Sequence, residues 1–413
     1  MISNRMDLYI NPPRILFGKG AIKKLGTEIK NIKESTCNLL IITDTNMEKN
    51  GILKKIEDEL KRSDLKWSNY VYDAKEPTKE SINNAIQVCR NKNRKNNFDA
   101  IIGLGGGSCM DTAKVLALLL TNEGDLEEYL KRPSKEIKKE SLMTILIPTS
   151  SGTGSEVSIF AVVINKKGQK GGITSEKLLP KLALIDPELT ISLPPRSTAG
   201  SGMDAFSHNA EGVISKIANP ISDALALEAI RLIAKNLRKA YYTSEDIEAR
   251  ANMSLASTIG GLVISFPWIA GPAILGHLVS EGISAQYNIP HGEACGVLLP
   301  YVFEFNLPNC EDKLKLIAEA MGVNTFGMSL RESAYEAIKE TFKLLEDIEL
   351  PTSLKDYNLP KKDIPAIVNY IVDERQYRSN LYRFNPRRIN KKNMTEFLEK
   401  AWEGKGSLEY IFK

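Results

Sequence analysis

Residues 98–108 read FDAIIGLGGGS, and they set the pattern from which we predict the fold. The apolar run up to residue 104 is typical of a buried parallel strand. Three glycines then lead directly into a helical pattern over residues 110–120. A strand that passes into a helix through so short a turn is the unit from which parallel sheets covered by helices are built.

The same alternation continues on both sides of this unit. Other strand patterns cover residues 38–44, 67–72, 142–147, 159–164 and 182–185, with residues 166–168 as a turn between the last two. Other helical patterns cover residues 20–32, 50–63 and 78–92, and helical patterns alone continue after residue 197. We therefore predict an α/β dinucleotide-binding domain with a mostly parallel sheet over residues 1–194 and an all-helical domain over residues 195–413.

Composition and charge argue against nucleic acid and membrane partners. The 413 residues are 42% hydrophobic and 26% charged, as in an ordinary globular protein, and the net charge of +4 is too small to indicate nucleic acid. No apolar run is long enough to span a membrane. The five cysteines include no C-x-x-C pair, which favours reduced thiols in the cytoplasm. We expect a small-molecule partner.

Two loops at strand ends are candidates for binding a cofactor. In the first, Gly105, Gly106, Gly107 and Ser108 would present backbone N–H groups and a helix N-terminus to a phosphate; the alternative is a plain tight turn. The second loop, residues 148–156, is rich in serine, threonine and glycine and could equally be a surface loop. Both follow strands, and open α/β sheets bind ligands at that edge.

Asp44 ends the strand pattern of residues 38–44. A carboxylate there can bond ribose hydroxyls and repel a 2′-phosphate, which favours NAD(H) over NADP(H). The alternative role is to cap the following helix.

The three histidines of the chain indicate a metal centre. His208 follows Asp204 by four residues, which puts both on one face of a helix, and His277 and His291 flank a second helical stretch. Imidazoles and a carboxylate are normal ligands of Zn²⁺ or Fe²⁺. A satisfied core histidine is the alternative for each one alone.

Arginines gather near the C-terminus together with Tyr377 and Tyr382. A charge run is usually a solvated face, and the alternative is a contact with an anionic substrate. The arginines are Arg375, Arg378, Arg383, Arg387 and Arg388.

Together these motifs resemble the iron-containing (group III) alcohol dehydrogenase family almost from end to end. The resemblance rests on residues 14–18, 105–111, 148–156 and 202–208, on His277 and on residues 290–292 and 385–387. It implies the dehydroquinate synthase-like fold, a metal in the cleft between two domains, and homodimers or larger assemblies. It also implies that Asp204, His208, His277 and His291 are the metal ligands. The positions that contact the cofactor in the family match Asp44, Gly105, Gly106, Gly107, Ser108, Asp111, Thr149, Ser150, Ser155 and Lys170.

The chain departs from the family near its third ligand. Ala273 stands where many members have an additional histidine credited with proton relay, and Phe266 replaces a common asparagine. Together with Trp268, Phe266 makes this neighbourhood bulky. We expect the proton to leave through a ribose hydroxyl, a serine or threonine, or water.

From the residues and the resemblance we predict a cytoplasmic, metal-dependent alcohol dehydrogenase or aldehyde reductase linked to NAD(H), with NADP(H) possible, and with Fe²⁺ or Zn²⁺ as the metal. No nucleic acid or membrane partner is expected. The alternatives are a reductase of an anionic aldehyde or oxoacid (a semialdehyde, a sulfo- or a phosphono-aldehyde), a dehydroquinate synthase-type lyase, a metal-free reductase, and a binding protein descended from an enzyme.

Overall fold

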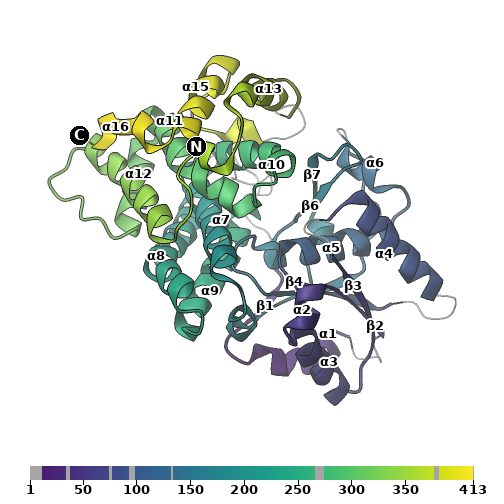
Figure 1. The fold of residues 1–413 in the computed structure, drawn as a ribbon. Helices are drawn as coiled ribbons and strands as arrows, with labels where there is room; N and C mark the ends of the chain where they lie inside the picture. Colours follow the sequence, from purple (N-terminus) through teal and green to yellow (C-terminus); the bar gives the residue numbers. More distant parts are fainter. Residues whose placement is uncertain are drawn as a thin grey trace. The chain divides into compact units, whose positions relative to one another are not determined.

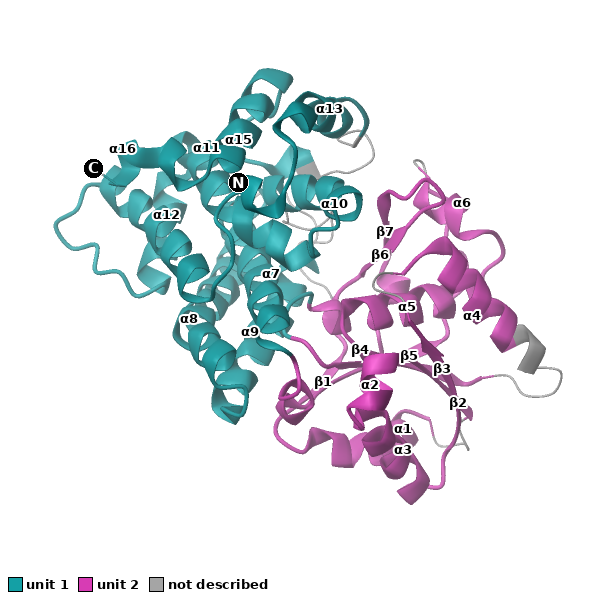
Figure 2. Ribbon diagram, in the orientation of Figure 1, with its two compact units in different colours: residues 1–10, 151–153, 194–413 teal, residues 11–150, 154–193 magenta. Residues whose placement is uncertain are grey.

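The structure is a computed structural model that describes residues 12–33, 38–73, 77–92, 98–131, 134–265, 274–375 and 381–412. The chain divides into two compact units (Figure 2). The sheet unit comprises residues 11–150 and 154–193, and the helical unit comprises residues 1–10, 151–153 and 194–413. Five residues named above lie outside the described ranges: Phe266, Trp268, Ala273, Tyr377 and Arg378.

The sheet unit is built on six strands that all run parallel (Figure 1). Their spatial order is β1-β8-β5-β4-β2-β3. This confirms the predicted parallel sheet. The strands are β1 (Arg14–Phe17), β2 (Asn38–Asp44), β3 (Lys66–Tyr72), β4 (Ala100–Gly105), β5 (Met143–Pro148) and β8 (Leu182–Ile185).

Helices cover both faces of this sheet. Consecutive residues of a strand point to opposite faces, so neighbouring residues pack against different helices. In β4, Ile102 packs into the apolar cluster of α1 (Leu25–Ile32) and α3 (Ile52–Arg62). Its neighbour Ile101 packs into the cluster of α4 (Lys79–Lys92) and α5 (Gly107–Thr121). Both isoleucines are completely buried, which explains why the strand is an uninterrupted apolar run.

The strand prediction was wrong at one place. The turn at residues 166–168 does not lead to the strand at residues 182–185. It joins β6 (Phe160–Ile164) to β7 (Lys170–Thr174), and these two strands form a separate antiparallel hairpin. Gly171 and Gly172 lie within β7, and glycine is depleted in strands, so the pattern concealed this strand.

The helical unit contains α7 (Pro195–Ile214), α8 (Pro220–Tyr242), α9 (Ile247–Ser265), α10 (Leu275–Tyr287), α11 (His291–Ala320), α12 (Leu330–Asp347), α13 (Ile364–Asn369), α15 (Lys391–Glu403) and α16 (Glu409–Phe412). Helices and short helical turns are the only regular elements described after residue 194, which confirms the helical prediction. No helix in the described ranges combines the length and apolarity needed to cross a membrane.

Helix α7 lies at the centre of this unit, packed against α8, α9 and α11. Small residues make the close packing possible. A Cβ atom on Gly202 would lie 2.3 Å from Leu237 Cδ1 on α8, and one on Gly292 of α11 would lie 2.2 Å from the carbonyl oxygen of Gly200. Side chains carried by α7 are therefore held at fixed positions against neighbouring helices.

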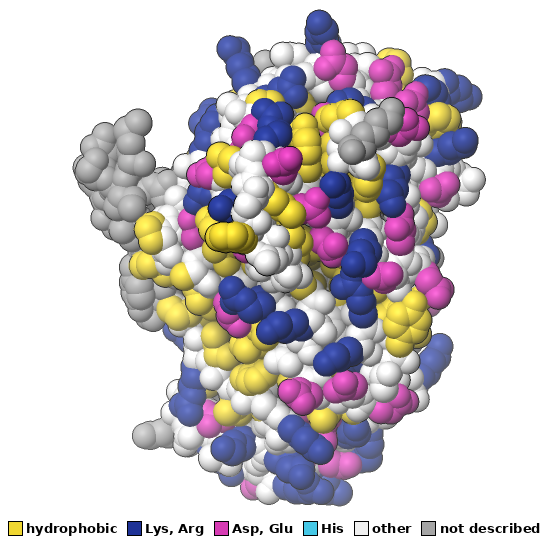
Figure 3. All heavy atoms as spheres, turned by 90° about the vertical axis from the view of Figure 1, so that its left-hand side faces the viewer, with side chains coloured by type: hydrophobic (Ala, Val, Ile, Leu, Met, Phe, Trp, Pro, Cys, Tyr) yellow, Lys and Arg dark blue, Asp and Glu magenta, His cyan; other side chains and the backbone are white. Residues whose placement is uncertain are grey.

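Lysine, arginine, aspartate and glutamate side chains are interspersed on the face shown in Figure 3. The mixture agrees with the small net charge of +4. Such a surface lacks the single-signed field that attracts nucleic acid.

Two charged residues of α5 hold the β6–β7 hairpin. The fully buried Lys114 donates to the carbonyl oxygens of Ser158 at 2.9 Å and Phe160 at 2.8 Å. Asp111 accepts hydrogen bonds from Ser155 Oγ at 2.6 Å and from the Val162 N–H at 2.9 Å. These buried polar groups are thus satisfied inside the unit.

We expect Lys114→Met to lower the free energy of unfolding by roughly 1–3 kcal/mol, because two buried carbonyl oxygens would lose their donor. Burial lowers the pKa of Lys114 to about 8. Above that pH the unfolded chain, whose lysine pKa is about 10.4, binds more protons than the folded chain. The stability of the wild type relative to the variant should therefore increase as the pH rises from about 8 to about 10.

Urea denaturation at several pH values measures this difference. Lys177→Met is the matched control, since Lys177 also donates to two backbone carbonyls but is partly exposed. A difference between wild type and Lys114→Met that shrinks with rising pH would contradict the expectation.

Candidate metal centre and nucleotide-binding loops

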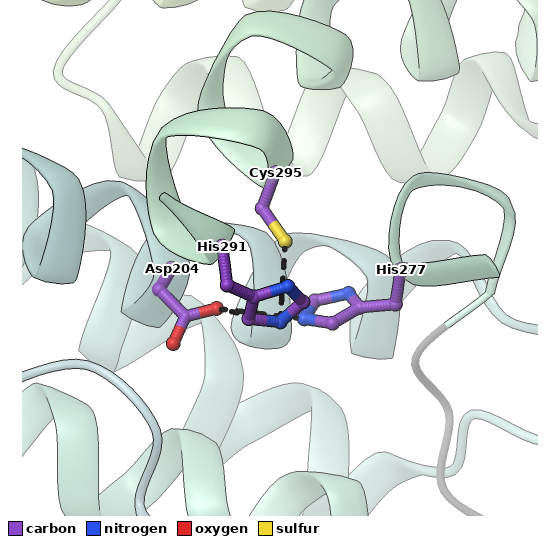
Figure 4. A group of neighbouring side chains, drawn as sticks. All are labelled: Asp204, His277, His291 and Cys295. Carbon is purple, nitrogen blue, oxygen red and sulfur yellow. Dashed lines mark hydrogen bonds and ion pairs between the residues drawn. The ribbon is translucent and has the colours of Figure 1, made fainter. Parts of the chain in front are cut away.

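Three helices bring a carboxylate and two imidazoles together. Asp204 lies in the middle of α7, His277 in the first turn of α10, and His291 at the first position of α11. Asp204 Oδ1 is 3.6 Å from His277 Nε2 and 3.8 Å from His291 Nε2. Figure 4 shows these side chains converging from their three helices.

The turn between α10 and α11 explains the position of His291. Asn288 ends α10 in the left-handed conformation, at φ 52°, and Pro290 precedes the first residue of α11. Asparagine tolerates this conformation, and proline cannot continue a helix. His291 therefore begins a new helix close to the end of the one that carries His277.

The residues present fit a divalent cation. Asp204 Oδ1 and His277 Nε2 are buried and have no hydrogen-bond partner, although they face each other. A tetrahedral ion with bonds of about 2.1 Å separates its ligand atoms by about 3.4 Å. The observed spacings of 3.6 and 3.8 Å are close to that value. Two unsatisfied acceptors facing each other are costly unless a positive charge lies between them.

His208 lies beside this group. Its ring stacks on that of His277, with centroids 4.4 Å apart, and its Nδ1 is 3.4 Å from the carbonyl oxygen of Gly152. The ligand atoms that lie within 4.8 Å of one another belong instead to Asp204, His277, His291 and Cys295. His208 is thus adjacent to the converging atoms, and its role as a ligand stays a prediction.

The protonation states of Asp204 and His208 also suit a cation. Burial raises the pKa of Asp204, but His208, His291 and His277 together lower it well below its usual value. Burial lowers the pKa of His208 to about 4, despite the opposing effect of Asp204. At neutral pH, Asp204 is therefore ionised and His208 is neutral, as metal binding requires. Burial lowers the pKa of His277, but Cys295, Glu211 and Asp204 raise it well above its usual value, so a bound cation would displace a proton there.

Cys295 is a member of the cluster that sequence reasoning missed. Its Sγ lies 3.2 Å from Ser280 Oγ and 3.7 Å from His291 Nε2. Burial raises the pKa of this thiol. Cys295 follows His291 by four residues on α11, and this helical spacing could have revealed it.

Glu211 was also missed, although it follows Asp204 by seven residues and His208 by three on α7. Its carboxylate is 2.9 Å from His277 Nδ1 and is fully buried. The spacing places it on the same helical face as the predicted ligands. A second carboxylate therefore lies behind His277, on the side away from Asp204.

The predicted nucleotide-binding residues gather at one edge of the sheet. Strands β2, β4 and β5 are neighbours, so Asp44, Gly105 and Thr149 stand side by side at their carboxyl ends. The Thr149 N–H donates to the Gly105 carbonyl oxygen at 3.0 Å. A Cβ on Gly106 would lie 3.5 Å from Ser150 Oγ, which shows how closely the two loops approach.

Helix α5 begins inside the glycine run, at Gly107, three residues before the predicted start. Gly105 has φ +141°, and a Cβ there would lie 2.7 Å from Cys109 Sγ. Only glycine fits this turn. The first-turn N–H groups of α5, including that of Ser108, therefore come from the loop predicted to bind phosphate.

Asp44 performs the capping role that was its alternative interpretation. Its Oδ1 accepts hydrogen bonds from the N–H groups of Asn46 at 2.7 Å and Met47 at 3.2 Å, at the start of α2 (Thr45–Lys49). Its Oδ2 is 3.4 Å from Cys109 Sγ. The cap occupies one carboxylate oxygen, and contact of the other with a ribose stays a prediction.

Three more predicted cofactor residues lie near one another on the hairpin side of α5. Asp111 bonds Ser155, and the charge of the buried Lys170 on β7 acts on Asp111. Burial nevertheless raises the pKa of Asp111. Both carboxylate oxygens of Asp111 already accept hydrogen bonds from the protein, so Asp111 supports the loop that carries Ser155.

Of the described tail arginines, Arg387 contributes to the packing of the helical unit. Its guanidinium lies over the ring of Phe305 at 4.6 Å and donates to the Phe305 carbonyl oxygen at 3.2 Å. Arg383 and Arg388 are exposed. These positions favour the solvated-face interpretation over an anion contact.

Comparisons with known proteins identify the family of this chain. A family model described as "Iron-containing alcohol dehydrogenase" matches residues 12–187, and one described as "Fe-containing alcohol dehydrogenase family, C-terminal" matches residues 198–402. Long-chain-alcohol dehydrogenase 1 of Geobacillus thermodenitrificans is 34% identical over 366 residues, which cover 88% of this chain and 90% of that protein.

Solved structures of alcohol and aldehyde oxidoreductases also match the fold of this chain. A crystal structure of 1,3-propanediol oxidoreductase matches with a TM-score of 0.88 and 31% identity, over 96% of this chain and 100% of that one. Sulfoacetaldehyde reductase from Bifidobacterium kashiwanohense, in complex with NAD⁺, matches with a TM-score of 0.82 and 29% identity, over 96% of this chain and 99% of that one.

Proposed function

Because the chain belongs to the iron-containing alcohol dehydrogenase family, we propose that its helical unit holds an iron(II) ion at Asp204, His208, His277 and His291. The chain is an oxidoreductase of the alcohol dehydrogenase and aldehyde reductase class, dependent on a metal and on NAD(P)(H). The observation that carries the proposal is the pair of buried atoms, Asp204 Oδ1 and His277 Nε2, that face each other at 3.6 Å without hydrogen-bond partners.

The contributions of three proposed ligands follow from their positions and charges. Asp204 supplies the negative charge, and its depressed pKa keeps that charge at neutral pH. His277 and His291 supply nitrogen atoms from two different helices. When bound, a divalent ion supplies Lewis acidity toward an alcohol or carbonyl oxygen. Zinc accepts the same donor atoms, so the ion that occupies the site also depends on metal supply.

The dinucleotide is proposed to bind the sheet unit at the carboxyl ends of β2, β4 and β5. The N–H groups at the start of α5 would receive the pyrophosphate, with Thr149 and Ser150 beside it. Asp44 Oδ2 accepts one hydrogen bond from the Cys109 thiol, and its second lone pair can accept from a ribose hydroxyl, which favours NAD(H). Ser155, held by Asp111, and Lys170 complete the proposed contacts. The binding of NAD⁺ by a similar reductase supports this part of the proposal.

A second candidate substrate is an anionic aldehyde. It is favoured by the likeness to a sulfoacetaldehyde reductase, whose name specifies a sulfonated aldehyde. The stacking of Arg387 on Phe305 does not favour it. A panel of neutral and anionic short-chain aldehydes separates the two candidates, since a sulfonate requirement would appear as turnover of the anionic members alone.

We also propose a cytoplasmic homo-oligomer of two domains, residues 1–194 and 195–413. The four cysteines in the described ranges are buried and form no disulfide, which suits a reducing compartment. Ile15 and Phe17 are exposed on β1, an edge strand of the sheet, and such edges are usually covered. Light scattering of the purified protein tests the oligomer, and a monomeric mass would contradict it.

Replacing His277 with alanine should remove both metal and turnover. Loss of a residue that only supports a ligand costs 10–100-fold in metal affinity or activity, so loss of a ligand should exceed about 100-fold. The measurements are metal content after dialysis and anaerobic oxidation of NADH with short-chain aldehydes. Gln286→Ala, on the exposed face of the same helix, is the control and should keep both.

A His277→Ala protein that is free of metal and still turns over at the wild-type rate would refute the ligand assignment. Wild-type protein that binds NAD(H) and metal but reduces no aldehyde would instead redirect the search to lyase chemistry.

Replacing Asp44 with glycine should reduce the preference for NADH over NADPH by about tenfold, as expected for the loss of one hydrogen bond that a ribose hydroxyl donates to a charged group. Glycine is nearly as good an N-cap as aspartate, so stability should fall by only a few tenths of a kcal/mol. The ratio of kcat/KM for the two cofactors is the measurement. Asp125→Gly, at the N-cap of α6 (Leu126–Leu130), is the matched control.

An unchanged cofactor ratio in Asp44→Gly would restrict Asp44 to its capping role.

A further inference from the structure

Glu211 is a fully buried carboxylate that accepts three hydrogen bonds at the start of α10. The donors are the N–H of Ile274 at 2.6 Å, the N–H of Gly276 at 2.6 Å and His277 Nδ1 at 2.9 Å. We propose that Glu211 is the positioning residue of the metal centre, which fixes the orientation and tautomer of His277. The inference rests on the proposed metal centre and assigns a role to a side chain outside its ligand set.

The contacts indicate that the carboxylate acts as an acceptor on both oxygens. Oε1 accepts from Gly276, and Oε2 accepts from Ile274. Both donors are backbone N–H groups at the N-terminus of α10, where no side chain of that helix provides a cap. A helix N-terminus favours an ionised carboxylate. Glu211 therefore caps α10 from α7.

The hydrogen bonds that Glu211 accepts determine which nitrogen of His277 carries the proton. Oε2 lies 2.9 Å from Nδ1, so Nδ1 must donate. In a neutral imidazole the other nitrogen then has a free lone pair. That nitrogen, Nε2, points at Asp204 Oδ1 across 3.6 Å. The tautomer imposed by Glu211 is therefore the one that can bind a cation beside Asp204.

The carboxylate of Glu211 approaches the backbone of α10 closely at Gly276. A Cβ atom on Gly276 would lie 2.2 Å from Glu211 Oε1 and 3.3 Å from Val302 Cγ2. Glycine at this position is thus required by the approach of the carboxylate. The ring of His277 also stacks on the ring of His208, with centroids 4.4 Å apart. Two residues of α7 therefore hold the imidazole: Glu211 through its Nδ1 and His208 against its face.

The Glu211→Gln variant keeps a polar side chain of similar size but changes its hydrogen bonds, so it tests whether those bonds position His277. A glutamine has one acceptor oxygen and one NH₂ group, so it cannot accept from all three donors. If its NH₂ faces His277, Nδ1 becomes the acceptor and Nε2 carries the proton, which removes the lone pair needed for the metal. Gly276→Ala is a second variant, which displaces the carboxylate without changing its charge.

The control is Asn219→Ala. Asn219 caps α8 by accepting hydrogen bonds from the N–H groups of Ile221 and Ser222 at 3.1 Å, so its loss removes backbone bonds at a helix N-terminus of the same unit without touching a histidine. It reports what a purely structural cap contributes.

The full-length proteins are compared by their dissociation constant for Zn²⁺, measured in competition with a chelator, and by the thermal midpoint of the metal-free form. Because the chain has three histidines, ¹⁵N spectra of the zinc-loaded protein also report the protonation of each ring. Glu211→Gln and Gly276→Ala should bind Zn²⁺ about 10–100-fold more weakly and shift the His277 Nδ1 resonance. Asn219→Ala should lower the thermal midpoint and keep the Zn²⁺ affinity.

Wild-type Zn²⁺ affinity in Glu211→Gln, or an unshifted His277 resonance, would overturn the inference while leaving the metal centre intact. Equal weakening by Asn219→Ala would reduce Glu211 to a structural cap. If the wild-type protein itself bound no Zn²⁺ at His277, both the proposed metal centre and the proposed role of Glu211 would be wrong.

Discussion

Two buried atoms that lack hydrogen-bond partners, Asp204 Oδ1 and His277 Nε2, face each other across 3.6 Å. Such a pair costs free energy unless a cation lies between the atoms. The helical unit holds the pair together through close backbone packing. Gly292 of α11 approaches the Gly200 carbonyl of α7 where a Cβ atom would lie at 2.2 Å, which brings the start of α11 against Asp204. The glycines of these helices therefore belong to the chemistry of the site as well as to its packing.

In the sheet unit, the main constraint is that the backbone after Gly105 must be open to the close approach of an anion. At Gly105 the chain adopts φ +141°, and a side chain there would collide with Cys109. The next residues start α5, so a row of N–H groups is presented at the carboxyl edge of the sheet beside Thr149. Asp111 and Lys114 of α5 then bind the β6–β7 hairpin from inside. One buried helix thus supports both the predicted phosphate loop and the hairpin around it.

The pattern of apolar residues was sufficient to predict the strands that are buried along almost their whole length. Strands β2 and β4, buried on both faces, stand out as apolar runs, whereas β7 contains two glycines in a half-exposed hairpin and was not predicted. At the site, the i,i+4 pair and the scarcity of histidine led to the prediction of Asp204, His208, His277 and His291, and the ligand atoms of Asp204, His277 and His291 do converge. Cys295 and Glu211 were not predicted, although helical spacing places each of them on a face that carries a predicted ligand. Spacing gives the face of one helix, and their contacts with His291 and His277 depend in addition on how α7, α10 and α11 pack together. Asp44 shows the opposite case, since its capping bonds were foreseen and are compatible with a second role.

The most direct test of a metal centre in the helical unit is anomalous diffraction from crystals of the iron(II)-loaded protein, collected on both sides of the iron absorption edge. The expected result is one anomalous peak in contact with Asp204, His277 and His291, with His208 completing its coordination. A peak bound by Cys295 in place of His208 would revise the fourth ligand. Fully loaded crystals with no peak near Asp204, or with iron held elsewhere in the chain, would contradict the proposed centre.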